Sequence, residues 1–183
     1  MRSKISAAVV GVIATLEQAY DDYCEMLDDV ERSIPIGQAQ RLLKAFQMDV
    51  AHTPAEAEAD LLEYCSHSAN PIGRLVLAIA GVIADPDADC EATRYSDAIC
   101  SGLQLVNFAQ DLGQDFSRGR IYTPRGWWPE GLMPHHTTAD LSDDQRTRLA
   151  TRMAQWGAEK IIAGRPLISL IKASPAAAPI WTK

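Results

Sequence analysis

The chain has 183 residues, of which 47% are hydrophobic and 22% are charged, and its formal net charge is −7 at pH 7. This length supports one domain over residues 1–183 with a substantial core, and this composition excludes an intrinsically disordered chain. The acidic balance argues against a nucleic-acid partner, because phosphate backbones attract clustered Lys and Arg.

The chain opens with a basic and then apolar stretch, residues 1–16 (MRSK followed by ISAAVVGVIATL). Signal peptides show such a pattern, but no small-x-small cleavage site precedes the acidic stretch from Glu17 to Asp22. Twelve mostly small residues are also too few to cross a bilayer. We therefore favour a core helix or a ragged chain start, and we predict no transmembrane helix.

Helical spacing of apolar residues then runs through the first half of the chain. We expect helices at 16–32, 38–50 and 53–84, the last with Thr53 as N-cap, Pro54 at its first position and a break at Asn70-Pro71-Ile72-Gly73. Proline fits the first turn of a helix but interrupts its interior, because it has no backbone N–H group.

The second half repeats this pattern. We expect a helix from Thr93 to Phe116, a loop at 122–136 anchored by Trp127 and Trp128, and a helix at 140–172 with Ser142 as N-cap and a break at 164–166. No segment alternates apolar and polar residues as a half-buried strand would. The predicted fold class is therefore all-α.

The four cysteines are Cys24, Cys65, Cys90 and Cys100. They form no CxxC pair, and no Cys/His spacing resembles that of a zinc site. We interpret them as free thiols in a reducing compartment, which favours a cytoplasmic protein.

The helix expected at 93–116 carries the most informative pattern. At about 100° per residue, four oxygen-bearing side chains fall on one narrow stripe: Gln104, Asn107, Asp111 and Asp115. Apolar residues occupy most of the remaining circumference, and such a helix is usually buried. Uncompensated carboxylates are stable on a buried helix only beside a wet cavity or a cation.

Two carboxylates one turn apart, beside an amide oxygen, supply the hard oxygen ligands that Mg²⁺ requires and leave positions for water and phosphate. We therefore predict a magnesium site at Asn107, Asp111 and Asp115. An ordinary amphipathic helix with a solvated acidic face has the same spacing, and this alternative stays open. Arg118 and Arg120 follow, either to hold a diphosphate or to complement the helix C-terminus.

Three segments together resemble the squalene/phytoene synthase family of head-to-head prenyl synthases. They are residues 104–111 (QLVNFAQD) with Asp115 and 119–124 (GRIYTP), residues 64–75 (YCSHSANPIGRL), and residues 42–50 (LLKAFQMDV). These match the family's second aspartate-rich motif, its tyrosine motif and the helix before that motif. The likeness is clear from about residue 19 to 134, fainter to about 171, and not recognised in the first sixteen residues. It implies an antiparallel helical bundle of the isoprenoid-synthase type around a deep apolar cavity.

Two departures from the squalene and phytoene synthase pattern point to one branch. Gln110 replaces an arginine, and Ser68-Ala69-Asn70-Pro71 replaces a Val-Ala-Gly sequence. Both resemble the bacterial hydroxysqualene synthases of hopanoid-type isoprenoid biosynthesis. The resemblance implies Mg²⁺-dependent ionisation of presqualene diphosphate, followed by water capture of the carbocation to give hydroxysqualene.

Two alternatives to this reaction stay open. One is a prenyltransferase that joins two farnesyl or geranylgeranyl diphosphates, and the other is a non-catalytic helical member of the family. Peripheral association with a membrane, through the apolar substrate or product, is also left open.

The resemblance also assigns roles to residues at matching positions. Asn107, Asp111 and Asp115 would bind Mg²⁺, and Gln104 would support them. Tyr64 would line the pocket near the reacting carbons, where its hydroxyl and ring can stabilise a cation. The residues expected to meet the diphosphate-bearing substrate are Gln104, Asn107, Arg74, Arg118 and Arg120, although an exposed helical arginine explains Arg74 nearly as well.

The family carries another aspartate-rich motif on a helix that faces this one. The acidic pairs Asp21-Asp22 and Asp28-Asp29 lie directly before the break at Ser33-Ile34-Pro35, where the family has an ordinary helix, so we do not assign them this role. We expect the chain to lack the N-terminal part with the first motif, and to show little turnover alone.

Overall fold

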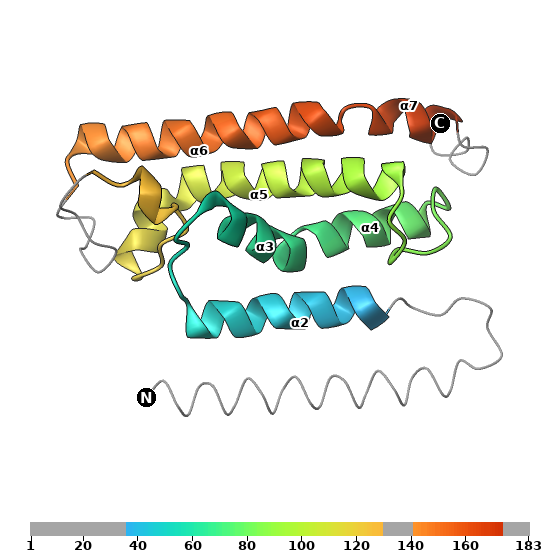
Figure 1. Ribbon diagram of the computed structural model, residues 1–183, viewed down its shortest axis with the longest axis horizontal. Coiled ribbons are helices and arrows are strands. Elements are labelled where there is room, and N and C mark those ends of the chain that lie inside the picture. The colour runs from blue at the N-terminus through green and yellow to red at the C-terminus, as the bar shows by residue number, and fades with distance from the viewer. Residues whose placement is uncertain (1–35, 130–140, 174–183) are drawn as a thin grey trace.

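The computed structural model describes residues 36–129 and 141–173. Its elements are α2 (Ile36–Ala51), α3 (Glu58–Ser68), α4 (Asn70–Ile79), α5 (Glu91–Ser117), the short 3-10 helix η1 (Arg125–Trp127), α6 (Asp143–Gly164) and α7 (Leu167–Ala173) (Figure 1). These two ranges contain no strand, so the predicted all-α class is confirmed. The helix predicted at 16–32, with its acidic pairs, lies outside the described residues.

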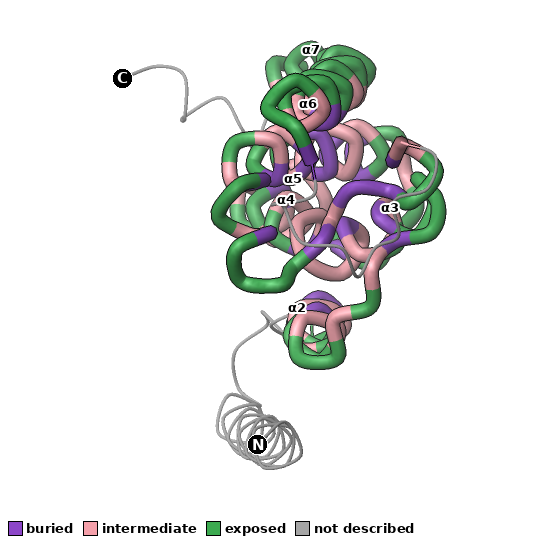
Figure 2. The backbone as a smooth tube through the Cα atoms, turned by 90° about the vertical axis from the view of Figure 1, so that its left-hand side faces the viewer, coloured by how far each residue is buried: buried purple, intermediate pink, exposed green. Residues whose placement is uncertain are grey.

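The long helices run antiparallel to one another (Figure 1). The direction of α2 is reversed by α3 and α4, which follow each other end to end, and it reverses again at α5 and at α6. Seen end-on, α5 lies between α6 on one side and α3 with α4 on the other, and α2 packs against α3 and α4 (Figure 2). The central position of α5 places its side chains against most of the bundle.

Buried apolar side chains gather on α5. One cluster joins it to α3 and α6 and contains Ala55, Leu61, Cys65, Leu105, Phe108 and Met153. A second cluster joins its C-terminal half to the following loop and to α6, and contains Leu112, Phe116, Ile121, Trp128, Leu141 and Leu149. Because burial of apolar surface is the main favourable term in folding, α5 is the helix that holds this bundle together.

The predicted burial of α5 on nearly all sides is wrong for one side of the helix. Leu103 is 56% exposed, whereas Leu105 is fully buried. The reason is that α3, α4 and α6 leave one side of α5 uncovered within the described part of the chain. The polar stripe of α5 therefore meets water along an open side.

Helices α5 and α6 approach each other closely at two glycines. A Cβ atom added to Gly102 would lie 2.6 Å from the carbonyl oxygen of Gly157, and one added to Gly157 would lie 2.7 Å from the carbonyl oxygen of Gly102. Real Cβ atoms do not come this near to a carbonyl oxygen. The contact between these two helices therefore requires glycine at both positions.

The start predicted for the third helix is wrong, because α3 begins at Glu58 and not after Thr53. The carboxylate of Asp60 accounts for the difference. Its Oδ2 atom accepts hydrogen bonds from the backbone N–H groups of Glu56 at 2.9 Å and Ala57 at 2.8 Å. These bonds satisfy backbone donors that the first turn of a helix leaves free, and they fix the helix start four residues later.

The helix predicted to run to residue 84 ends earlier, because α4 stops at Ile79, but several other predicted boundaries are confirmed. Helix α4 begins at Asn70 with proline in its first turn, and α6 ends at Gly164 before the predicted break. The Oγ atom of Ser142 accepts a hydrogen bond from the backbone N–H of Gln145 at 3.2 Å, as an N-cap should. Trp128 is buried and donates from Nε1 to the Thr123 hydroxyl at 2.9 Å, so it anchors the loop as predicted.

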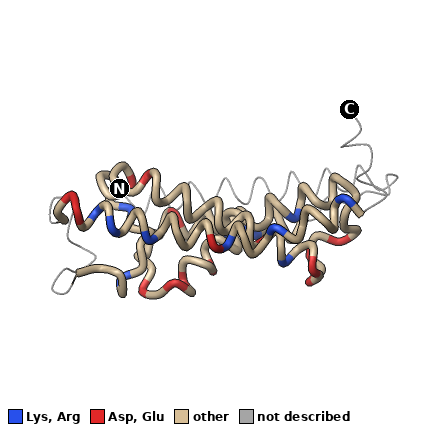
Figure 3. Tube along the Cα trace, turned by 90° about the horizontal axis from the view of Figure 1, so that it is seen from above, with Lys and Arg blue, Asp and Glu red and all other residues tan. Residues whose placement is uncertain are grey.

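Charged residues of both signs are distributed over the described part of the chain (Figure 3). Several ion pairs are local and exposed, for example Arg94 with Asp89 at 3.1 Å and Arg148 with Asp144 at 2.7 Å. Exposed pairs of this kind contribute at most about 1 kcal/mol each. Within the described ranges, no helix combines the length and the apolar character needed to cross a bilayer.

Candidate functional site

The polar stripe of α5 lies at the boundary between core and solvent. Asp111 and Asp115 are half-buried, as is Gln104, and Asn107 is exposed. The buried side of the same turns carries Phe108 and other apolar residues. The carboxylates are thus carried by a helix at the edge of the core.

The carboxylate of Asp115 is disturbed by its surroundings. Burial and the neighbouring charge of Asp111 raise the pKa of Asp115, and the guanidinium groups of Arg120 and Arg118 oppose this rise. A divalent cation would relieve the repulsion between the carboxylates, because it favours their ionised forms. The donor set, two carboxylates with an amide oxygen on the preceding turn, therefore fits Mg²⁺.

This donor set is sparse. Within the ranges that the structure covers, no group of three or more His, Cys, Asp or Glu side chains is placed to hold a metal ion. Mg²⁺ usually keeps several waters and binds through one or two carboxylates together with substrate phosphates. The stripe on α5 matches that mode of binding and not an all-protein cage.

A Schellman turn ends α5. Gly119 has a φ of +74°, its N–H donates to the carbonyl of Phe116 at 2.9 Å, and the N–H of Arg120 donates to the carbonyl of Asp115 at 2.8 Å. Glycine adopts this left-handed conformation without steric cost. The turn reverses the chain, so the residues that follow run back towards the C-terminal end of α2.

His52 binds the segment that follows this turn. Its Nε2 atom accepts a hydrogen bond from the backbone N–H of Ile121 at 2.7 Å. Burial and the charge of Arg120 lower the pKa of His52, so the ring is neutral at pH 7 and carries its proton on Nδ1. His52 also has a φ of +26°, a value that is uncommon for any residue but glycine and that often occurs at functional sites.

Two tyrosine hydroxyls meet on one carboxylate oxygen. Tyr64 of α3 donates to Oδ1 of Asp49 on α2 at 2.9 Å, and Tyr122 donates to the same atom at 3.0 Å. Burial and the carboxylate of Asp49 raise the pKa of both phenols, that of Tyr122 to about 12. Both tyrosines are therefore neutral across the physiological range of pH.

An aromatic cluster fixes these phenols against α5. Phe108 stacks on Tyr122, with 4.1 Å between ring centroids and 13° between ring planes. The ring of Tyr64 lies 5.9 Å from Phe108 and 5.5 Å from Tyr122. Since Phe108 lies four residues after Gln104 and three before Asp111 on the same helix, the cluster lies beside the polar stripe.

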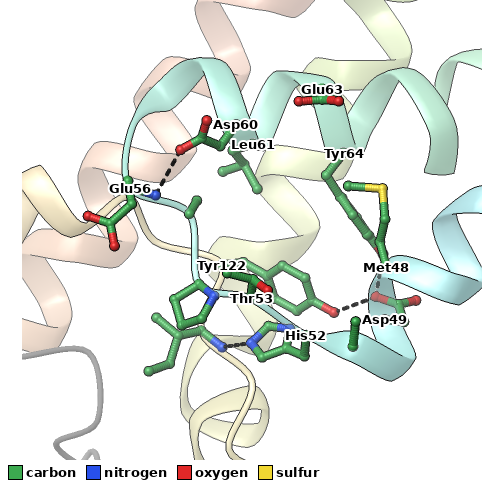
Figure 4. Close-up of a pocket in the computed structure, with 14 residues that line it drawn as sticks. Met48, Asp49, His52, Thr53, Glu56, Asp60, Leu61, Glu63, Tyr64 and Tyr122 are labelled. Atoms are coloured by element: carbon green, nitrogen blue, oxygen red, sulfur yellow. Dashed lines mark hydrogen bonds between the residues drawn. The ribbon is translucent and has the colours of Figure 1, made fainter. Parts of the chain in front are cut away.

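A pocket of about 290 Å³ opens beside the two phenols. Asp49, His52, Tyr64 and Tyr122 form one wall, and both hydroxyls point towards Asp49 (Figure 4). The acidic residues Glu56, Asp60 and Glu63 also line it, and the carboxylate of Glu56 pairs with Arg125 at 3.2 Å. The pocket combines electron-rich rings with negative charge, which suits a cationic species.

The structure brings several of the predicted site residues into one region. The pKa of His52 responds to Arg120 and Asp115 as well as to Asp49, so the end of the α5 stripe lies close to the pocket wall. Tyr64 joins the same region through Phe108. Arg118 also acts on Asp115, and the side chains of both arginines beyond the helix are exposed.

Arg74 lies elsewhere. Its guanidinium donates to the carboxylate of Asp97 at 2.9 and 2.6 Å and to the carbonyl of Pro86 at 3.0 Å. Asp97 precedes Asp111 on α5 by a rise of roughly 21 Å at 1.5 Å per residue. The structure therefore places Arg74 in a link between α4, α5 and the loop before α5, with its side chain only 12% exposed.

Sequence reasoning did not assign roles to Asp49, His52 and Tyr122. Asp49 and Tyr122 lie inside segments that carry the family resemblance, so a signal for them was present. His52 had none, because a single histidine after a helix has no distinctive spacing. Their meeting depends on the turn at Gly119, which joins residues that are 69 and 73 positions apart.

Comparisons with known proteins give a consistent family. The model of the squalene/phytoene synthase family matches residues 3–182, and the match includes residues 3–16, where no likeness was recognised from the sequence. Hydroxysqualene synthase from Rhodopseudomonas palustris is 38% identical over 96 residues, 52% of this chain and 31% of that protein. The corresponding enzyme from Sinorhizobium fredii is 42% identical over 95 residues, 51% of this chain and 30% of that protein.

Two further matches extend the range of similar proteins. The 15-cis-phytoene synthase of Enterobacter agglomerans is 34% identical over 114 residues, 62% of this chain and 36% of that protein. A crystal structure of a squalene synthase from Alicyclobacillus acidocaldarius matches with a TM-score of 0.49 and 28% identity, over 76% of this chain and 60% of that one. The alignments with these curated relatives span about a third of their length.

Proposed function

The chain belongs to the squalene/phytoene synthase family, whose members act on prenyl diphosphates in isoprenoid biosynthesis, and from this premise we propose that it takes part in the conversion of presqualene diphosphate to hydroxysqualene. The observation that carries the proposal is the carboxylate pair of Asp111 and Asp115, of which Asp115 is near enough to act on the pKa of His52 in the wall of an aromatic pocket that suits a carbocation. Leaving-group stabilisation and cation stabilisation are the two tasks of this reaction.

The choice of this branch is supported by two local sequence features. Gln110 and the Ser68–Pro71 segment depart from the squalene and phytoene synthase pattern in the way that hydroxysqualene synthases do. Two of the similar curated proteins carry that name.

Asn107, Asp111 and Asp115 would hold Mg²⁺, with Gln104 on the same stripe to support them. The bound ion would neutralise charge that develops on the departing pyrophosphate. Arg118 and Arg120 are exposed just past the helix, where their guanidinium groups could bind phosphate oxygens.

The aromatic pocket would receive the organic part of the reaction. The C–O bond to diphosphate would break and its electron pair would leave with pyrophosphate, so a carbocation would remain beside Tyr64 and Tyr122, which line the pocket. Ring faces and phenol oxygens stabilise such a cation. Water then forms the new C–O bond and releases a proton to solvent or to pyrophosphate.

A second candidate is the condensation of two prenyl diphosphates, as in phytoene synthesis. The match to the 15-cis-phytoene synthase covers a larger share of this chain than the hydroxysqualene synthase matches do. Product analysis with presqualene diphosphate and with farnesyl diphosphate separates these candidates, because only the first reaction starts from presqualene diphosphate.

The metal role is tested by calorimetric titration of the purified chain with pyrophosphate, with and without Mg²⁺. We expect Mg²⁺ to strengthen binding, and Asp111→Asn to remove this dependence with the fold intact, because it removes a charge and little volume. Asp144→Asn is the matched control, since Asp144 is an exposed aspartate on α6. Equal pyrophosphate binding with and without Mg²⁺ in the unaltered chain would refute the metal role.

The same titration checks the role predicted for Arg74. If the donors of Arg74 remain engaged with Asp97 and Pro86, Arg74→Gln should retain Mg²⁺-dependent binding of pyrophosphate. A loss of binding in a folded Arg74→Gln variant would support the prediction that this arginine meets diphosphate.

A further inference from the structure

We propose that Asp49 is a positioning residue that acts through Tyr64 and Tyr122: it accepts both hydroxyl protons, so that the two phenols present their oxygen lone pairs and rings to a cation in the pocket. The effect of this arrangement on a cation rests on the proposed function. Its structural core, the coupling of two phenols to one carboxylate, stands without that function.

The three groups come from separate parts of the chain. Asp49 lies in the last turn of α2, Tyr64 lies on α3, and Tyr122 follows the turn after α5. The two hydrogen bonds, at 2.9 and 3.0 Å, end on the same Oδ1 atom. One carboxylate oxygen therefore sets the directions of two side chains that local structure does not relate.

A phenol has one proton to donate. When that proton is committed to Asp49, the oxygen can act only as an acceptor towards any other group. Neither tyrosine can then protonate the substrate or the pyrophosphate. A hydrogen bond to a charged acceptor also strengthens the negative end of the phenol dipole, which favours a nearby cation.

The surrounding rings prevent the phenols from turning away. Phe108 stacks on Tyr122, and the His52 ring meets the edge of Tyr122 at 5.3 Å and 73°. His52 also holds Ile121, the residue before Tyr122, through its Nε2 atom. The end of α2 thus contacts the returning chain at two points, His52 and Asp49.

The raised pKa of Tyr122, to about 12, agrees with this arrangement, because burial and the neighbouring carboxylate both disfavour a phenolate. A neutral phenol is the form needed for a hydrogen-bond donor.

A first experiment tests the coupling alone, in the ligand-free full chain. Tyrosine labelled with ¹³C at Cζ is incorporated, and the signals of Tyr64 and Tyr122 are assigned from the Tyr→Phe variants. We expect Asp49→Asn to move both signals, because the charged acceptor is lost. Glu63→Gln, which removes a nearby carboxylate without a hydrogen bond to either phenol, should leave them in place. Unchanged signals in Asp49→Asn would overturn the proposal.

The single Tyr→Phe variants keep the proposal open to refutation even if Asp49→Asn fails to fold, although the two tyrosines also act on each other directly. In each of them, Oδ1 of Asp49 accepts one hydrogen bond instead of two. The remaining phenol should therefore change its Cζ signal. If the Cζ signal of each tyrosine stays the same when the other hydroxyl is removed, the two phenols are not coupled through Asp49.

A second experiment tests the effect on a cation. The probe is a C15 prenyl dimethylammonium ion, titrated without Mg²⁺ or pyrophosphate. We expect Asp49→Asn to weaken its binding roughly tenfold, but to change it less than about twofold when Tyr64 and Tyr122 are both phenylalanine. An equal loss in both backgrounds would mean that Asp49 attracts the cation directly, and would overturn the positioning role.

These outcomes are distinguishable from failure of the proposed function. If pyrophosphate binding proves independent of Mg²⁺ while the Cζ signals respond to Asp49, the proposed function fails and the coupling stands. If the Cζ signals are unaffected while Mg²⁺-dependent binding is found, the positioning role fails alone.

Discussion

At the scale of single residues, the carboxylate of Asp115 shows how a binding site opposes folding. Its pKa is raised by burial and by Asp111. A group whose pKa is higher in the folded state than in the unfolded state gives stability that is complete below the unfolded pKa and is lost as the pH rises through the folded pKa. At neutral pH, the ionised Asp115 therefore makes folding less favourable than its protonated form would.

Because the pKa of Asp115 is raised, Asp115→Asn should stabilise the chain in the absence of divalent cations. The free energy of unfolding at pH 7, measured by urea titration in EDTA, should rise, and its decline from pH 4 to pH 7 should become shallower. The exposed control Asp144→Asn should not raise the free energy of unfolding. A lower free energy of unfolding for Asp115→Asn would mean that its carboxylate makes stabilising contacts in the folded chain.

The candidate site was predictable from sequence only where its residues are close together in the chain. Asp111 and Asp115 follow from one helical repeat, and Arg120 from its position after the helix. The pairing of Asp49 with Tyr64 and Tyr122 depends on tertiary packing over 15 and 73 positions, which no local pattern contains. Arg74 lies inside a segment that resembles the family motif, but this local pattern does not predict that its guanidinium binds the carboxylate of Asp97.

At the scale of helices, ends marked by strong local signals were predicted well. Ser142 caps α6 as expected, and proline separates α3 from α4. The start of α3 was predicted wrongly, because Thr53-Pro54 is a good N-terminal signal that competes with Asp60. The helix starts where Asp60 places it, because the Asp60 carboxylate accepts hydrogen bonds from two backbone N–H groups. Sequence alone does not rank two such signals only a few residues apart.

The close contact between α5 and α6 leads to a prediction about glycine. Gly102→Ala should lower the free energy of unfolding by about 1 to 3 kcal/mol, because the new methyl group would overlap the carbonyl oxygen of Gly157. The intrinsic preference of alanine for helices acts in the opposite direction and is smaller, about 1 kcal/mol. Urea unfolding followed by circular dichroism measures the change.

Gly113 offers a matched control on the same helix. A Cβ atom added there meets no other atom within 4 Å, so Gly113→Ala should raise the free energy of unfolding by up to about 1 kcal/mol. If both substitutions stabilise the chain, α5 and α6 are not in close contact at Gly102.

At the scale of the whole molecule, the bundle leaves one face of α4 open. Ile72, Val76 and Ile79 are 49%, 57% and 86% exposed, and their spacing places them on one side of the helix. Leu77 on the opposite side is buried, with only 4% exposed. A row of large apolar side chains in water is typical of surfaces that associate with other apolar matter.

We therefore expect the double variant Val76→Glu, Ile79→Glu to self-associate less than the unaltered chain and to bind less of a hydrophobic dye. Light scattering and dye fluorescence measure these effects. The free energy of unfolding should change by no more than roughly 0.5 kcal/mol, as is usual for exposed positions. Leu77→Ala supplies the contrast, because truncation of a buried leucine should lower it by about 2 to 5 kcal/mol. If the double variant unfolds as readily as Leu77→Ala, this face of α4 is covered in the folded chain and contributes to its core.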